Sequence, residues 1–178
     1  MSHKTWTILI ILLAVVIGLV LIFFPSKKAF EMKKELVVIE LENGSKVVME
    51  LYSDVAPKTV ENFKTLINKK FYDGLAFHRV IPGFVAQGGD PAGNGTGGPG
   101  YTIKAEFNEK PHLVGTVAMA RAADPDSAGS QFYICLAPQP SLDRKYTVFG
   151  QVTEGMDEVQ KIKVGDKMKR VYLEPIKN

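Results

Sequence analysis

The chain has 178 residues, of which 46% are hydrophobic and 23% are charged, a composition that excludes a wholly disordered protein. Its single cysteine, Cys135, excludes an internal disulfide, and its three histidines lack the spacing of a metal site. The formal charge of +3 arises in residues 1–35, which hold five lysines and two glutamates, whereas residues 36–178 balance 17 basic against 17 acidic residues. This basic flank indicates anionic lipid headgroups as a partner and argues against nucleic acid.

Residues 6–24 form an uncharged, apolar segment with aromatic residues at both ends. As a helix it spans roughly 28 Å, which matches the hydrocarbon thickness of a bilayer. The residues that follow it offer no small-x-small cleavage site, so we predict an uncleaved signal anchor and not a removed signal peptide. The anchor makes the lipid bilayer a partner of residues 6–24.

The anchor divides the chain into a tail over 1–5, the membrane helix over 6–24, a basic linker over 25–35 and one domain over 36–178. The short tail before a long domain favours a single-pass protein whose domain lies on the extracytoplasmic side. The lysines that follow the helix favour the opposite orientation under the positive-inside rule. Of the two orientations, we expect the exported domain.

After the linker, two β-branched runs over 36–41 and 46–51 flank Asn43-Gly44, which predicts a hairpin. Residues 57–69 begin with a proline and carry apolar residues at helical spacing, which predicts an amphipathic helix. Further short strands are expected over 76–81, 84–87, 116–119, 131–136, 146–151 and 170–174, with a second helix over 156–162. The pattern predicts a closed eight-stranded antiparallel barrel capped by two helices.

The loop Gly93–Gly98 reads GNGTGG and matches the dinucleotide-binding pattern G-x-G-x-x-G. No helix is expected after it, because Pro99-Gly100 follows, and no acidic residue lies about twenty positions further on. We interpret it as a structural loop and predict no cofactor.

Strand alternation over 76–81 places Phe77, Arg79 and Ile81 on one face. An arginine among apolar residues is usually an edge residue that reaches water. The surrounding stretch FHRVIPGFVAQGGD, residues 77–90, resembles the signature of the cyclophilins and favours a functional role. Four more blocks agree with that family in order and spacing, at residues 55–63, 94–98, 118–132 and 147–150.

The resemblance covers about residues 36–175 and is strongest to the compact microbial members. It implies a peptidyl-prolyl cis-trans isomerase, or rotamase, which accelerates rotation about Xaa-Pro bonds in unfolded or flexible proline-containing polypeptides. It also implies that the reaction needs no cofactor or metal and that the catalytic domain is a monomer. The catalytic positions of the family match Arg79 and Gln87. Its substrate-binding positions match Phe84, Val85, Ala120, Arg121, Gln131, Tyr133, Leu142 and Tyr146.

Three positions depart from the family pattern. Val85 replaces a methionine, Tyr133 replaces a phenylalanine, and Ser141 replaces an aromatic residue before Leu142, which predicts weak cyclosporin binding and a looser pocket wall. Val85 and Ser141 leave a second hypothesis open, a membrane-tethered proline-binding or chaperone module with little turnover.

Overall fold

The computed structural model describes residues 35–174, so the predicted anchor over 6–24 lies outside the described residues. Within the described part, no helix is long and apolar enough to span a bilayer. The eight strands are β1 Leu36–Leu41, β2 Lys46–Leu51, β3 Arg79–Ile81, β4 Val85–Gly88, β5 Thr116–Met119, β6 Phe132–Cys135, β7 Val148–Glu154 and β8 Met168–Leu173. The helices are α2 Pro57–Asn68 and α3 Met156–Val159, with 3-10 turns η1 Pro125–Ser127 and η2 Pro140–Leu142.

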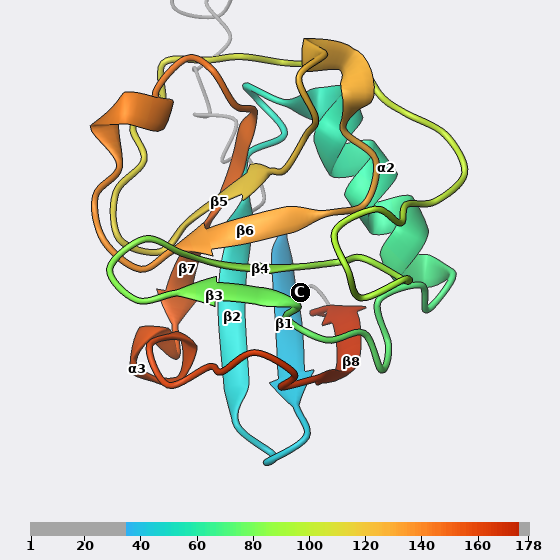
Figure 1. Cartoon of the computed structure of the whole chain (residues 1–178), viewed down its shortest axis with the longest axis vertical. Coiled ribbons are helices and arrows are strands. Elements are labelled where there is room, and N and C mark those ends of the chain that lie inside the picture. Colours follow the sequence, from blue (N-terminus) through green and yellow to red (C-terminus); the bar gives the residue numbers. More distant parts are fainter. Residues whose placement is uncertain (1–34, 175–178) are drawn as a thin grey trace, which may run out of the picture. The chain divides into compact units, whose positions relative to one another are not determined.

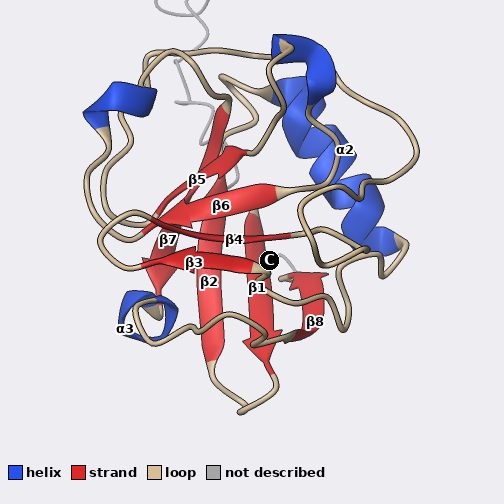
Figure 2. Cartoon of the chain, viewed as in Figure 1, coloured by secondary structure: helices blue, strands red, loops and turns tan. Residues whose placement is uncertain are grey.

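All eight strands join one sheet in the order β3-β4-β6-β5-β7-β2-β1-β8, and every pairing is antiparallel. The sheet curls on itself, so that β3, β4 and β6 cross in front of β1 and β2 (Figure 1). Helices α2 and α3 lie at opposite ends of the strands (Figure 2). The sequence predicted a mainly β fold with eight antiparallel strands and two helices, and the structure confirms this.

Among the described residues the eight strands form seven ladders, and no eighth ladder closes the barrel, contrary to the expected full closure. The edge strands β3 and β8 do not pair with each other. The segment before β3 instead contacts the start of β8, through an isolated antiparallel bridge between Ala76 and Lys167 and through hydrogen bonds between Met168 and residues 74 and 75. Hydrogen bonds from Phe77 N–H to Asp166 O and from Gly165 N–H to Phe77 O extend this contact. The bridge therefore closes the curl over a few residues where a full strand pair was expected.

The predicted strand over 76–81 is too long. Only its last three residues form a strand, β3, and pair with β4. Phe77 is fully buried in the core, whereas Arg79 and Ile81 are exposed. The shared face predicted for these three residues is therefore wrong for Phe77. Its backbone is bonded to the chain before β8 and not to β4, which interrupts the alternation.

Helix α3 is shorter than the predicted span of 156–162. After Val159 the chain continues with N–H groups of Lys161 and Ile162 bonded to carbonyls three residues back, at Glu158 and Val159. These are turns of the 3-10 kind, so the α-helical pattern ends although the backbone stays coiled. Strands β1, β2 and β5 have the predicted bounds, and the ends of the remaining elements shift by one to three residues.

Helix α2 buries Val60, Phe63, Leu66 and Ile67, the apolar face that its spacing predicted. Its own N-cap residue, Ala56, has no side-chain cap. Instead Glu106, from the long segment after β4, accepts hydrogen bonds from the N–H groups of Lys58 and Thr59 at 3.1 and 2.8 Å. A distant carboxylate thus satisfies the N–H groups that a local cap usually satisfies.

The core inside the curled sheet is built around Phe63. Its ring centroid lies 4.9 Å from that of Tyr72, 5.5 Å from Phe132 and 5.0 Å from Phe149. All four rings are buried. Phe63 therefore joins α2 to strands β6 and β7.

We predict that Phe63→Ala lowers the free energy of unfolding by about 3–5 kcal/mol, because a buried ring leaves a cavity that its neighbours fill only in part. Urea unfolding measures the change. Val164→Ala is the control, since Val164 is 64% exposed and the substitution should stay within about 0.5 kcal/mol. A loss below about 1 kcal/mol for Phe63→Ala would contradict this account of the core.

Candidate active site

A pocket of about 180 Å³ lies on the outer face of the sheet, opposite the core. Strand alternation creates the two faces: Ala86 and Ile134 point into the core, whereas Val85, Tyr133 and Cys135 point outward. The residues that line the pocket are Arg79, Phe84, Val85, Gln87, Ala120, Arg121, Tyr133, Leu142 and Tyr146. Nine of the ten residues predicted for the site therefore meet in one pocket, and Gln131 lines the adjoining one.

Strand register sets the polar side of this pocket. Arg79 of β3 lies opposite Gln87 of β4, and Gln87 lies opposite Tyr133 of β6. The three side chains therefore stand in one row across three strands. An arginine, an amide and an aromatic ring meet in this row although the sequence separates them by up to 54 positions.

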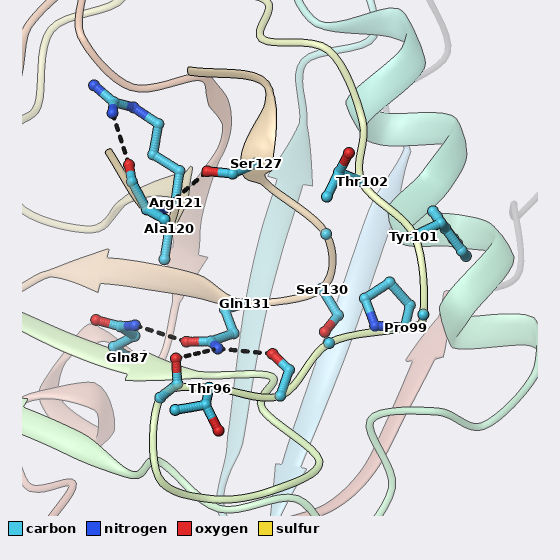
Figure 3. Close-up of a pocket in the computed structure, with 16 residues that line it drawn as sticks. Gln87, Thr96, Pro99, Tyr101, Thr102, Ala120, Arg121, Ser127, Ser130 and Gln131 are labelled. Atoms are coloured by element: carbon cyan, nitrogen blue, oxygen red, sulfur yellow. Dashed lines mark hydrogen bonds between the residues drawn. The ribbon is translucent and has the colours of Figure 1, made fainter. Parts of the chain in front are cut away.

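A chain of hydrogen bonds holds the Arg79 side chain. Its Nη1 donates to Gln87 Oε1 at 3.1 Å, and Gln87 Nε2 donates to Gln131 Oε1 at 2.9 Å. Gln131 Nε2 in turn donates to the carbonyls of Gly95 and Gly97 at 3.0 and 2.9 Å, as Figure 3 shows for part of this chain. In both glutamines the amide oxygen accepts on the side of Arg79 and the amide nitrogen donates on the other side, so all these hydrogen bonds run in the same direction.

The guanidinium itself lies at the rim and is exposed. Its Cζ lies 5.6 Å from the centroid of the Phe84 ring, within the range of a cation-π contact. Among residues 35–174 no carboxylate forms an ion pair with Arg79. The contact with Gln87 is the one side-chain hydrogen bond that Arg79 makes within the described residues, which leaves most of its N–H donors available to a ligand.

The apolar side of the pocket is a small cluster separate from the core. Val85, Tyr133 and Cys135 form it together with Ala118 and Val148, and Phe84, Leu142 and Tyr146 pack against it. Burial raises the pKa of the Cys135 thiol to about 12, so this side chain serves as a small apolar group.

A second, wider pocket of about 500 Å³ adjoins the first and shares Gln87, Ala120 and Arg121 with it (Figure 3). The Arg121 guanidinium does not point freely into it: Nε and Nη2 donate to Lys145 O, and Nη1 donates to the carbonyls of Ala122 and Ala123. Its Cζ also lies 4.7 Å from the Tyr146 ring. Arg121 thus fixes the backbone beside the first pocket.

The glycine-rich loop is organised by Asp90, to which the sequence analysis gave no role. Asp90 is 1% exposed, and its carboxylate accepts hydrogen bonds from the N–H groups of Ala92, Asn94 and Gly95. A Cβ at Gly97 would lie 2.1 Å from Asp90 Oδ1, so the loop can wrap the carboxylate only with glycine there. The GNGTGG segment therefore binds an anion from its own chain, which leaves its carbonyls to hold Gln131.

Burial by itself raises the pKa of Asp90, but the three N–H donors outweigh it and hold the pKa below the ordinary value of 3.8. A lowered pKa in the folded state means that ionised Asp90 stabilises the fold above the ordinary pKa. This contribution is lost as the pH falls from that value toward the lower folded one.

The pocket floor contains a contact that the sequence analysis missed. The Tyr133 hydroxyl lies 3.1 Å from His112 Nε2, and His112 Nδ1 lies 2.9 Å from Asp143 Oδ1. The backbone N–H of His112 donates to the same oxygen at 2.8 Å, and the two contacts lower the pKa of Asp143. No local pattern signals this arrangement, because the three residues come from separate segments. Among residues 35–174, no three His, Cys, Asp or Glu side chains gather in a metal-binding group.

The fold and this pocket define a proline-directed isomerase of the cyclophilin class, and the comparisons agree. The family model for the cyclophilin type peptidyl-prolyl cis-trans isomerase/CLD matches residues 36–177, so the chain belongs to this family. Peptidyl-prolyl cis-trans isomerase B of Bacillus subtilis is 54% identical over 136 residues, which cover 75% of this chain and 94% of the relative. A peptidyl-prolyl cis-trans isomerase of Synechococcus elongatus is 48% identical over 138 residues, covering 76% and 94%.

Solved structures show the same fold. A crystal structure of a Cryptosporidium parvum cyclophilin type peptidyl-prolyl cis-trans isomerase matches with a TM-score of 0.74 and 29% identity, covering 80% of this chain and 98% of that one. Another structure of that protein, in the presence of the dipeptide Ala-Pro, matches with a TM-score of 0.73 over 79% and 99%. The chain is therefore a peptidyl-prolyl cis-trans isomerase, an enzyme that assists protein folding by accelerating rotation about Xaa-Pro bonds.

We predict that Asp90→Asn lowers the free energy of unfolding at pH 7 by about 1–3 kcal/mol, because the amide replaces a buried acceptor of three N–H groups. The difference from wild type should shrink below pH 3.8, where wild-type Asp90 begins to take up its own proton. Urea unfolding at pH 7 and at pH 3 measures both values. Asp124→Asn, at an exposed turn carboxylate, is the control. An equal difference at both pH values would contradict the assigned role.

Proposed function

We propose that Arg79 catalyses the rotation by donating hydrogen bonds to the proline nitrogen while the first pocket holds the proline ring. The barrier to turning an Xaa-Pro bond is about 18–20 kcal/mol, because the C–N bond has partial double-bond character. No covalent bond breaks in the reaction, so it needs neither a nucleophile nor a proton relay. It needs groups that stabilise the twisted amide more than the planar one.

In the twisted state the proline nitrogen becomes pyramidal and regains a lone pair. A guanidinium is always charged and presents several N–H donors, so it can donate to that lone pair, and it gains little from the planar amide. The observation that carries the proposal is the position of Arg79: fixed on one side by Gln87, unpaired with any carboxylate of residues 35–174, and at the rim of an apolar pocket. We assign Gln87 the role of orienting this donor.

We assign the apolar side chains of Phe84, Val85, Tyr133 and Leu142 to the pyrrolidine ring, and Ala120, Arg121, Gln131 and Tyr146 to the flanking substrate backbone. Ala-Pro, the dipeptide of the Cryptosporidium structure, supports a proline ligand for the matching pocket here. One chain lines the whole pocket, so the proposal requires no second copy and takes the catalytic domain as a monomer.

We predict that Arg79→Ala lowers kcat/KM by about 10²–10³, as the loss of one preorganised donor does in other enzymes, with the fold retained. A protease-coupled assay on a short Xaa-Pro peptide measures the rate, and thermal unfolding checks the fold. Arg79→Lys should fall between wild type and alanine, because lysine keeps the charge but not the planar fork.

Arg170→Ala is the matched control, since Arg170 is an exposed arginine that also lies over an aromatic ring, that of Tyr172, away from the pocket. It should leave kcat/KM unchanged. An Arg79→Ala variant within threefold of wild type would refute the assigned role of the guanidinium.

We also propose that residues 6–24 anchor the enzyme in a membrane, with the catalytic domain on the extracytoplasmic side. The support is the sequence of this segment, nineteen uncharged residues with aromatic residues at both ends. There the domain would meet exported chains as they emerge, when proline isomerisation limits their folding.

We predict that the full chain stays with membranes after alkaline carbonate extraction. Replacing Leu13 and Val16 by arginine should shift it to the soluble fraction, because each central arginine costs about 2.5–3.5 kcal/mol on the insertion scale. Leu13→Ile is the control. In intact spheroplasts, added protease should digest the domain if it is exported. Full protection would reverse the proposed orientation, and release of the unchanged chain by carbonate would exclude the anchor.

A further inference from the structure

The wall of the proline pocket lacks the aromatic side chain that the cyclophilin resemblance leads one to expect. Ser141 stands at that position and is exposed, and its carbonyl accepts a hydrogen bond from Lys145 Nζ. Leu142, the next residue, still lines the pocket. Something other than packing at position 141 must hold Leu142 against the floor formed by Tyr133.

The polar contact below the pocket joins this wall to the floor. Asp143 directly follows Leu142, and its Oδ1 accepts from both the backbone N–H and the ring Nδ1 of His112. The carbonyl of His112 accepts from Gln139 N–H at 2.8 Å, at the start of the wall segment. His112 therefore makes three bonds to the segment that carries Leu142.

The other side of the same ring faces the floor. His112 Nε2 lies 3.1 Å from the Tyr133 hydroxyl, and the two rings are stacked with centroids 6.1 Å apart. A carboxylate only accepts, so Nδ1 carries the proton that points to Asp143, and in the neutral ring Nε2 accepts from the tyrosine. His112 is 1% exposed, which excludes water as a ready substitute for either partner.

We propose that His112 is a positioning residue for substrate binding: by bonding Asp143 and Tyr133 at once, it sets the distance between the wall and the floor of the proline pocket. The Tyr133 hydroxyl, which the phenylalanine expected at this position would lack, then supplies the contact between His112 and the pocket floor. The inference rests on the pocket assigned above as the proline site. It concerns how tightly the ring is held and leaves the chemical role of Arg79 untouched.

The predicted signature is a change in KM without a change in kcat. A looser pocket weakens the grip on the ring in the ground state and the transition state alike, which raises KM and leaves kcat unchanged. A merely structural defect acts differently: it lowers the fraction of folded enzyme, which lowers the apparent kcat at constant KM.

The experiment is a double-mutant cycle with His112→Phe and Tyr133→Phe in the full chain. His112→Phe should raise KM about 5–10-fold, because it leaves a buried tyrosine hydroxyl without a partner. Tyr133→Phe should raise KM about 2–5-fold, because it leaves His112 Nε2 unpaired. The double variant should raise KM by no more than His112→Phe alone, because each single change already breaks the link between Tyr133 and Asp143.

Two controls separate this inference from the function on which it rests. Tyr172→Phe removes the same hydroxyl outside the pocket and should leave KM unchanged. Leu142→Ala tests the pocket directly and should raise KM. If Leu142→Ala raises KM while the His112 and Tyr133 variants do not, or if their effects simply multiply, the inference is overturned and the pocket stands. If none of them changes KM, the pocket assignment itself fails.

His112→Phe could prevent folding, which thermal unfolding would reveal. In that case Tyr133→Phe carries the test, because it removes one oxygen and adds no volume. A KM for Tyr133→Phe equal to that of Tyr172→Phe would then overturn the proposal.

Discussion

The site depends on the pairing of β4 with β3 on one side and β6 on the other. This register brings a guanidinium, an amide and an aromatic ring into one row on the outer face of the sheet. A slip of one residue in β4 would turn Gln87 into the core and Ala86 outward. Ala86 is the residue of β4 that packs in the hydrophobic core, and its burial favours the register that the site requires.

Two hydrophobic clusters lie on the two faces of the same strands, and they serve different purposes. The larger one, around Phe63, fills the curled sheet and supplies stability. The smaller one, around Tyr133, lines a pocket at the surface, which is the proposed proline site. Both come from simple alternation, so a catalytic pocket can be added to this fold without disturbing its core.

Buried polar groups keep the rim of the pocket in place. Asp90 gathers the N–H groups of the glycine-rich loop, and this leaves the loop carbonyls of Gly95 and Gly97 to hold Gln131. His112 bonds the wall to the floor in the same manner. Both Asp90 and His112 are buried titratable residues whose side chains are hydrogen-bonded. Buried polar networks of this kind make their surroundings rigid. Rigidity suits an enzyme whose task is to favour one shape of an amide over another.

The sequence alone determined the strand and helix pattern, because side-chain periodicity and turn residues are local properties. It also determined the family, through blocks such as residues 77–90, and hence the residues of the pocket. Only the tertiary structure decided how the barrel edges meet and that Phe77 turns inward, because those contacts pair segments some ninety residues apart. The roles of Glu106 and His112 were hidden for the same reason, because their partners lie far away in the sequence. Asp90 differs, since it bonds N–H groups only two to five residues ahead, a local turn that the sequence analysis did not identify.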